Sequence, residues 1–170
     1  MTASKLESAE TGAKLAAIGR SQAVIEFTAS GEILTANENF LSTVGYGLDE
    51  IRGQHHRMFV DPALAQSPDY AAFWGRLGRG EFVTAEFRRV GKGGREIWLQ
   101  ASYNPIFDLD GRVTKVVKFA SDVTERVAAV NEIADALHHL SDNDLEIRID
   151  RPLTPAFERL RVDFNGSIDR

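Results

Sequence analysis

Two neighbouring histidines, His55 and His56, are the residues of this 170-residue chain best suited to bind a metal. A neutral imidazole is a common axial ligand of heme iron, so either ring could hold a heme. Neighbouring side chains in an extended segment point in opposite directions, so at most one of the two would face a pocket. The alternative is a hydrogen-bonded histidine at the edge of the core. His138 and His139 diverge on a predicted helix, and we expect them to be solvated.

Other side chains could contact a ligand in the same pocket. Trp74 lies on the apolar stripe of a predicted helix over 69–77, where it could offer a flat aromatic surface or simply belong to the core. Arg89 continues the alternation of a predicted strand, so it could meet a ligand carboxylate or phosphate on the concave face, or extend outwards at the strand end. Asn37 could contact a ligand head group or cap a helix. Ala101 is small and would leave room for a ligand.

The composition excludes several classes of chemistry. There is no cysteine, which excludes disulfides, iron–sulfur clusters, thiolate zinc sites and thiol nucleophiles. Twenty Lys and Arg residues oppose 25 Asp and Glu, giving a formal net charge of -5 without a basic block, so we expect no nucleic acid partner. No phosphate-loop, Gly-x-Ser-x-Gly or His-Glu-x-x-His motif is present, and we expect a protein that is not an enzyme. The apolar runs are too short for a membrane span or a signal peptide, which favours a cytoplasmic protein.

The elements that must position these residues follow from the periodicity of the apolar side chains. An amphipathic helix is predicted over 4–19, and short helices are predicted between residues 37 and 77. Turn signals at 29–32, 91–94 and 108–111 separate segments that read as strands, at 23–27, 33–37, 81–90, 96–106 and 113–121. This order predicts an α+β fold, with a five-stranded antiparallel sheet and short helices on one face.

The last third of the chain has a different pattern. Apolar residues follow a heptad spacing along one predicted helix, and a second apolar stripe follows after a connector that contains Pro152 and Pro155. One exposed helix cannot bury such a seam alone, so we expect a parallel homodimer through these C-terminal helices. The two stripes consist of Val123, Val130, Ile133, Leu137 and Leu140, and of Phe157, Leu160, Phe164 and Ile168.

Several segments between residues 21 and 125 together resemble a PAS domain, with the subtype of bacterial methyl-accepting chemotaxis proteins. They include Thr35-Ala36-Asn37-Glu38-Asn39-Phe40-Leu41, His55-His56-Arg57-Met58-Phe59-Val60, Gly91-Lys92-Gly93-Gly94-Arg95-Glu96-Ile97-Trp98 and Ser102-Tyr103-Asn104-Pro105-Ile106. The closing Ser121-Asp122-Val123-Thr124-Glu125 resembles the element that passes a signal to the following helix, which implies a relay role for Asp122 and Thr124. Asp122 is also a candidate N-cap paired with Glu125.

The resemblance implies a sensory input module for chemotaxis or aerotaxis, coupled to a kinase complex through a signalling tip beyond residue 170. Aerotaxis transducers that bind FAD carry a Trp at the place of Trp74, and His56 and Met58 match that family as well. Val60-Asp61-Pro62-Ala63 replaces the charged run that follows there. The resemblance therefore implies FAD, with heme b on His55 or His56, or no cofactor, as alternatives.

Residues 136–168 resemble a HAMP-type helical relay, with Asn143 where such connectors usually have Gly. The predicted organisation is an N-terminal flanking helix at 1–20, a PAS domain at 21–124 and a helical relay at 125–170. The alternatives are the input domain of a histidine kinase or of a cyclic-dinucleotide enzyme, and a cofactor-free dimerisation module. The residues that follow in the parent protein would distinguish them.

Overall fold

The computed structural model describes residues 3–169, so residues 1–2 of the predicted flanking helix lie outside it. The described chain forms two compact units, one ending at Asp122 and the other beginning at Val123. Each unit is described by itself below. Within the described residues, no helix is long and apolar enough to cross a membrane.

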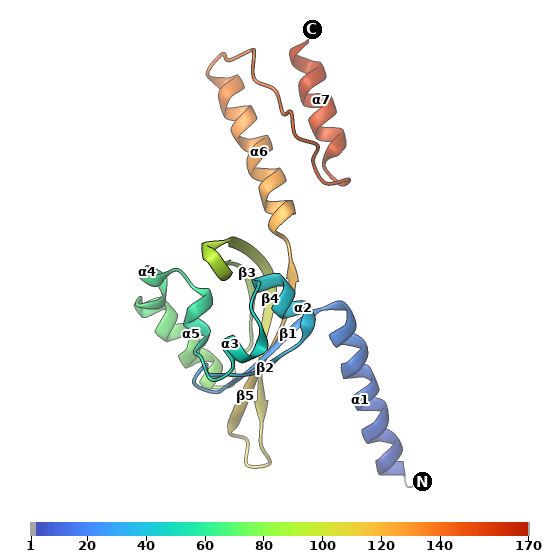
Figure 1. The fold of residues 1–170 in the computed structure, drawn as a ribbon, viewed down its shortest axis with the longest axis vertical. Coiled ribbons are helices and arrows are strands. Elements are labelled where there is room, and N and C mark those ends of the chain that lie inside the picture. Colours follow the sequence, from blue (N-terminus) through green and yellow to red (C-terminus); the bar gives the residue numbers. More distant parts are fainter. Residues whose placement is uncertain (1–2, 170) are drawn as a thin grey trace. The chain divides into compact units, whose positions relative to one another are not determined.

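The first unit is built on one five-stranded sheet with the order β2-β1-β5-β4-β3, in which every neighbouring pair is antiparallel (Figure 1). This confirms the predicted α+β fold. The strands are β1 (Ala23–Thr28), β2 (Ile33–Ala36), β3 (Val83–Val90), β4 (Glu96–Phe107) and β5 (Val113–Asp122).

One face of the sheet is buried because apolar side chains alternate along the strands. In β1, every second side chain from Ala23 to Phe27 is buried, and in β4 the same is true from Ile97 to Tyr103. The tight turn between β3 and β4 is the 3-10 turn η2 (Lys92–Gly94), where Gly93 and Gly94 both have positive φ. These glycines allow the chain to reverse its direction through a backbone conformation that other residues rarely adopt.

Short helices cover the buried face of the sheet (Figure 1). Each of three helices begins at a side chain that accepts a backbone N–H: Asn37 caps α2, Asp61 caps α4 and Ser67 caps α5. The covering elements are α2 (Glu38–Val44), α3 (Leu48–Ile51), the 3-10 turn η1 (His56–Phe59), α4 (Pro62–Ala65) and α5 (Pro68–Gly78).

The N-terminal helix α1 (Ala3–Ser21) is joined to this unit at its C-terminal end. The Asn37 amide donates to the carbonyl oxygens of Gly19 and Gln22, each at 2.8 Å, while its oxygen accepts from Val24 N and Phe40 N. All the polar atoms of Asn37 are therefore engaged in fixing the junction between α1, β1 and α2.

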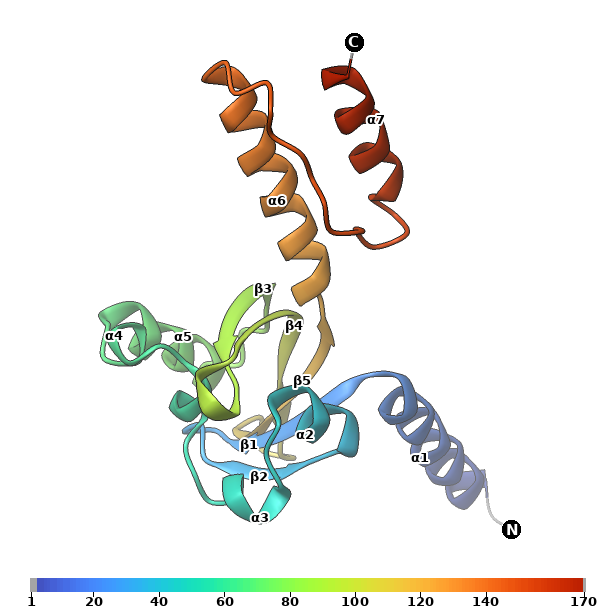
Figure 2. The same cartoon turned by 45° about the horizontal axis from the view of Figure 1, so that its top comes forward.

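The second unit consists of α6 (Thr124–Ser141), a connector and α7 (Glu158–Ile168), and the two helices run in the same direction (Figure 2). Its core joins Ala129 and Ala136 of α6 to Ile149 and Leu153 of the connector, with Phe157 and Phe164 packed against them. Asn143, which follows the C-cap Asp142 of α6, has φ +63°, a left-handed conformation.

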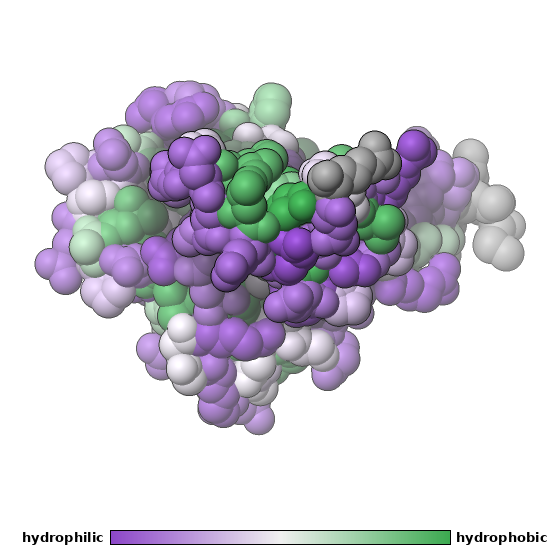
Figure 3. All heavy atoms as spheres, turned by 90° about the horizontal axis from the view of Figure 1, so that it is seen from above, coloured by the Kyte–Doolittle hydropathy of each residue, from purple (hydrophilic) through white to green (hydrophobic). Residues whose placement is uncertain are grey.

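The predicted heptad seam is divided between two faces of α6. Ile133 packs into the core of the second unit, whereas Val130 and Leu137 are 48% and 52% exposed. Figure 3 shows hydrophobic residues gathered in a patch on an otherwise largely hydrophilic face. The apolar surface left for a partner is therefore narrower than the sequence predicts.

The predicted N-cap at Asp122 is wrong. Asp122 pairs with Leu99 as the last residue of β5, which holds its backbone extended, and Val123 is the N-cap of α6. The sheet ladder extends one residue further than the helix-start pattern predicts, so the helix begins at Thr124.

Candidate functional site

The side chain of His56 lies at the centre of the first unit and is completely buried. Its Nδ1 is 2.9 Å from the Tyr70 hydroxyl on α5, and its Nε2 is 3.0 Å from the Tyr103 hydroxyl on β4. Both ring nitrogens are therefore hydrogen-bonded, and the imidazole links the helical layer to the sheet.

Aromatic rings surround His56 on several sides. The Tyr70 ring stacks on it, with an interplanar angle of 12°, while Phe27 and Trp74 meet it edge to face. We call this group the His56 cluster; its rings are those of Phe27, His56, Phe59, Tyr70, Phe73, Trp74 and Tyr103.

His56 is neutral because its surroundings disfavour the charged form. Burial lowers the pKa of His56 well below its ordinary value, and the positive charges of Arg89 and Lys118 lower it further. A neutral imidazole has one N–H and one acceptor nitrogen. The hydrogen positions must therefore be assigned from the surrounding hydrogen bonds.

The partners of Tyr103 decide which nitrogen carries the hydrogen. The Tyr103 hydroxyl already accepts a hydrogen bond from Arg89 Nη2, at 3.2 Å. If His56 Nε2 also donated to it, the phenol hydrogen would have no acceptor among the described residues. We therefore assign the hydrogen to Nδ1: Tyr103 donates to His56 Nε2, and His56 Nδ1 donates to Tyr70.

Two cations lie in the core beside this chain of hydrogen bonds. Arg89 on β3 is 5% exposed and Lys118 on β5 is 1% exposed. Lys118 lies opposite Tyr103 in the ladder, with its Nζ 4.9 Å from the centre of the Tyr103 ring. Among the described residues, neither cation forms an ion pair with a carboxylate. Two positive charges are thus buried without a negative partner.

The ionisable groups of this core influence one another. Burial lowers the pKa of Lys118, since desolvation disfavours its charged form. Burial alone would raise the pKa of Tyr103, but the attraction of Lys118 and Arg89 outweighs that effect and lowers it. The Tyr103 hydroxyl is therefore the group that best compensates the two cations.

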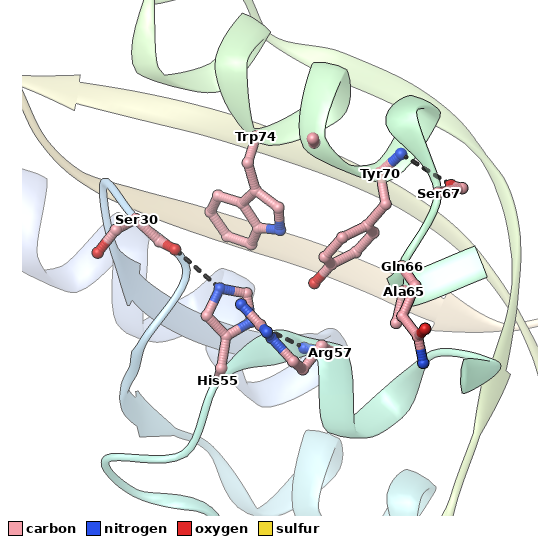
Figure 4. Close-up of a pocket in the computed structure, with 9 residues that line it drawn as sticks. Ser30, His55, Arg57, Ala65, Gln66, Ser67, Tyr70 and Trp74 are labelled. Carbon is pink, nitrogen blue, oxygen red and sulfur yellow. Dashed lines mark hydrogen bonds between the residues drawn. The ribbon is translucent and has the colours of Figure 1, made fainter. Parts of the chain in front are cut away.

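A surface pocket of about 310 Å³ lies next to the cluster (Figure 4). Tyr70 and Trp74 of α5 form one wall, and His55 and Arg57 form the other. His55 Nε2 lies 2.9 Å from the Ser30 carbonyl oxygen, and its Nδ1 accepts from the Arg57 N–H. No acidic side chain lines this pocket, whose lining is Ser30, His55, Arg57, Ala65, Gln66, Ser67, Tyr70, Ala71 and Trp74.

The indole N–H of Trp74 is buried and has no hydrogen-bond partner among residues 3–169. It lies near enough to the Tyr70 hydroxyl to offset part of the rise that burial causes in the pKa of Tyr70, but it does not have the geometry of a hydrogen bond. Arg89 Nε is the other buried side-chain nitrogen without a partner in the described part of the chain. Such groups are rare because each costs free energy on burial.

The structure brings only some of the predicted binding residues together. His56, Trp74 and Arg89 meet in or beside the His56 cluster, and His55 lines the neighbouring pocket. Met58 is partly buried against the core. Asn37 is the one predicted binding residue that lies elsewhere, at the α1 junction. Asp122 and Thr124, which were predicted as relay residues, lie at the end of β5 and at the start of α6.

The sequence reasoning missed Tyr70, Tyr103, Lys118 and Arg57. Lys118 shares its strand alternation with the buried Val116 and Ala120, so the pattern that drew attention to Arg89 would also have placed Lys118 on the buried face. No sequence signal pairs the two tyrosines with His56, because these contacts span 14 and 47 residues.

Neither predicted cofactor fits the side chains as they are arranged. Both nitrogens of His56 and of His55 are occupied, so neither ring offers one to a heme iron. The rings of Tyr70 and Trp74 already pack against His56, so they occupy this part of the concave face where a flavin ring would need space. In addition, the described residues contain no cluster of three His, Cys, Asp or Glu side chains for a metal ion.

Comparison with known sequences assigns the first unit to a protein family. Residues 33–120 match the PAS fold family. The chain is 48% identical over 139 residues to the biofilm dispersion protein BdlA of Pseudomonas aeruginosa, a match that covers 82% of the chain and 33% of that protein. It is 29% identical over 107 residues to the aerotaxis receptor of Escherichia coli, covering 62% of the chain and 21% of the receptor. The chain thus spans a third or less of these curated relatives.

Solved structures resemble the first unit as well. An RNA-binding light-oxygen-voltage receptor superposes with a TM-score of 0.58 and 25% identity, covering 69% of this chain and 34% of that one. The PAS domain of a protein from Colwellia psychrerythraea superposes with a TM-score of 0.59 and 19% identity, covering 68% and 98%. The second likeness concerns the fold alone.

Proposed function

The chain belongs to the PAS fold family, and from this premise we propose that it is the sensory input module of a chemotaxis or aerotaxis receptor. The observation that carries the proposal is the path of contacts through His56. It begins at Tyr70 in the wall of a pocket and ends at Tyr103, beside Lys118 on β5. A ligand that moves Tyr70 therefore acts on the strand that leads into α6.

The relay that we propose uses the covalent order of the chain. Lys118 precedes Asp122, where β5 ends, by four residues, and α6 begins at Thr124. A shift of Tyr103 changes the contacts of Lys118 and biases the end of β5. Asp122 and Thr124 would pass this bias to α6, and a parallel dimer of the HAMP-like helices would carry it to a signalling tip and its kinase complex.

FAD is the cofactor that the resemblance predicts, with heme b as the alternative. The similarity to an aerotaxis receptor supports FAD. The filled His56 cluster opposes both. The absorption spectrum of the purified protein distinguishes them. Flavin released by heat indicates FAD, whereas a Soret band lost in His55→Ala or His56→Ala but kept in His138→Ala indicates heme. A colourless protein that takes up neither on reconstitution indicates another ligand.

A test of the sensory function uses the parent receptor with Tyr103→Phe. This change removes one hydroxyl, which breaks the link from His56 to Arg89 while keeping the ring. We expect normal protein abundance and a reduced response of swimming cells to an oxygen gradient, with altered kinase activity. Thr84→Ala, on the exposed side of β3, is the matched control. If Tyr103→Phe responds like the wild type, the path through His56 does not carry the signal.

Two alternatives belong to other classes of protein. The chain could be the input domain of a histidine kinase or of a cyclic-dinucleotide enzyme, or a PAS module that only dimerises. The residues that follow 170 in the parent protein discriminate the first alternative: a long helical hairpin supports the receptor, and an ATPase or cyclase motif contradicts it. We propose that the chain itself has no catalytic activity.

A further inference from the structure

The first unit buries two cations, and their burial is not explained by a contribution to the stability of the fold. A buried charge without a partner is destabilising, and such charges are normally paired. Arg89 donates to the Tyr103 hydroxyl and lies over the Phe87 ring. Lys118 Nζ lies over the rings of Phe40 and Tyr103. Apolar side chains of similar volume at both positions would make the folded unit more stable.

The edge of the Arg89 guanidinium that carries Nε and Nη2 has the geometry of an anion site. Its Nη1 donates to the backbone carbonyl of Arg88 at 2.8 Å, and its Nη2 donates to Tyr103. Nε, which lies on the same edge of the guanidinium as Nη2, has no partner. This edge binds the two oxygens of a carboxylate in parallel hydrogen bonds.

The side chains around this buried edge are apolar or aromatic. The rings of Phe73 and Phe87 stand beside Tyr103, with centroid distances of 4.9 Å and 5.3 Å to its ring. Next to them, three alanines lie in register across neighbouring strands: Ala85 of β3, Ala101 of β4 and Ala120 of β5. Their side chains are the smallest that carry a Cβ atom; Ala101 and Ala120 are buried, and Ala85 and Phe87 are partly exposed.

We propose that Arg89 and Lys118 hold the anionic group of a small planar ligand, an aromatic carboxylate, whose ring lies against Phe73, Phe87 and the alanine row. The Tyr103 hydroxyl stands in for the carboxylate when the site is empty of ligand. Binding therefore moves Tyr103 away from Arg89 and disturbs its hydrogen bond to His56. This inference rests on the proposed sensory function; it names a class of ligand that enters the path through His56 at Tyr103 rather than at Tyr70.

The test measures the binding of benzoate, with benzamide as its neutral counterpart. In a Trp98→Phe background, Trp74 is the only tryptophan and its fluorescence reports on the His56 cluster. We expect saturable binding of benzoate and none of benzamide at the same concentrations. Arg89→Gln should weaken benzoate binding more than about tenfold, because it removes a buried charge-assisted pair of hydrogen bonds.

Matched variants separate this site from other cationic surfaces. Arg88→Gln, next in the sequence but exposed, should bind benzoate like the wild type. If Arg89→Gln does not fold, Arg89→Lys takes its place: it keeps the charge, loses the forked edge and should bind benzoate more weakly than the wild type. Arg57→Gln tests the surface pocket of Figure 4 and should have no effect.

Lys118→Met gives an independent signature in thermal unfolding. Removing the unpaired buried charge should raise the unfolding midpoint of the ligand-free protein and abolish its further rise with benzoate. A residue with a purely structural role would instead lower the midpoint and leave the benzoate effect intact.

Several results would overturn the proposal. They are equal binding of benzoate and benzamide, unchanged binding in Arg89→Gln, and loss of binding in Arg57→Gln. If the protein is purified with a flavin or heme, a spectrum lost in Arg89→Gln but kept in Arg88→Gln assigns the anionic group to that cofactor. A spectrum kept in both variants contradicts the inference. None of these results depends on the swimming assay, so the sensory function and the ligand class can fail separately.

Discussion

His56 makes the stability of the first unit depend on pH. Its pKa is lowered well below the ordinary value in the folded protein, so below about pH 6.5 the unfolded chain binds a proton that the folded chain does not. We therefore expect the free energy of unfolding to be independent of His56 above about pH 7 and to decrease as the pH falls below 6.5. Urea unfolding at pH 7.5, 6.0 and 5.0 measures this dependence.

The variant His56→Gln isolates the contribution of this residue. It should be less stable at every pH, but its stability should change less between pH 7.5 and 5.0. His55→Gln should keep most of the pH dependence, because burial lowers the pKa of His55 to a smaller extent. The exposed glutamates with lowered pKa values, such as Glu50 and Glu81, lose their contribution only below about pH 4.5. An equal pH dependence in wild type and His56→Gln would contradict the assignment.

Gly31 shows how a single backbone position shapes the pocket. Its φ is +93°, and a Cβ atom there would lie 2.9 Å from His55 Nε2 and from two carbons of Trp74. Gly31→Ala should therefore destabilise the first unit by about 2–3 kcal/mol, from the strained φ and the contacts together. Gly53→Ala, with φ +75° and nothing within 4 Å of the added carbon, should cost only about 1 kcal/mol. Equal losses of stability in urea would show that the contacts with His55 and Trp74 do not matter.

At the scale of secondary structure, the strands were the most predictable elements. Alternating apolar residues and glycine turns place β3, β4 and β5 within a few residues of their observed bounds, because both signals are local. The start of α6 was not predictable in the same way, since the pairing of Asp122 with Leu99 depends on the neighbouring strand.

The candidate site was predictable only in its parts. Strand alternation places Arg89 on the concave face, and its burial follows from the helices that cover it. The hydrogen bonds of His56 to Tyr70 and Tyr103 depend on how α5 packs over β4, which no local pattern encodes. For that reason the sequence left open whether this histidine binds a ligand or forms hydrogen bonds in the core, and the fold has it fully hydrogen-bonded.

The connector of the second unit depends on a left-handed residue at Asn143. Asparagine tolerates this conformation and glycine adopts it freely, whereas a β-branched side chain does not. Asn143→Gly should change the stability by less than about 0.5 kcal/mol, and Asn143→Val should lower it by about 1–2 kcal/mol. Hydrogen exchange of the α6 amides measures both effects. A destabilising Asn143→Gly would indicate that the side chain, rather than the backbone, holds the connector.

At the scale of the whole molecule, the exposed side chains of α6 form the surface that we propose for dimerisation. Val130 and Leu137 are seven residues apart, and about half of each side chain is exposed. Replacing both with Asp should place charges in the seam and convert a dimer into a folded monomer. Light scattering gives the mass, and circular dichroism confirms the fold.

Two further variants make this result interpretable. Asn131→Asp, exposed on the same helix, should remain dimeric. Ile133→Asp should unfold the second unit, because Ile133 packs into its core. A wild-type chain that stays monomeric at high concentration, or a double variant that stays dimeric, would exclude this face of α6 as the interface.

The hydrogen bonds through His56 all point in one direction, from Tyr103 through the imidazole to Tyr70, so the Tyr70 hydrogen faces the pocket. A ligand that accepts this hydrogen leaves the direction of the hydrogen bonds unchanged. A ligand that donates to Tyr70 in its place can reverse the order, and Tyr103 then loses its acceptor at a cost of about 1–3 kcal/mol. The direction of these hydrogen bonds thus makes the pocket selective: it should bind hydrogen-bond acceptors more tightly than donors, by roughly 5- to 150-fold in affinity.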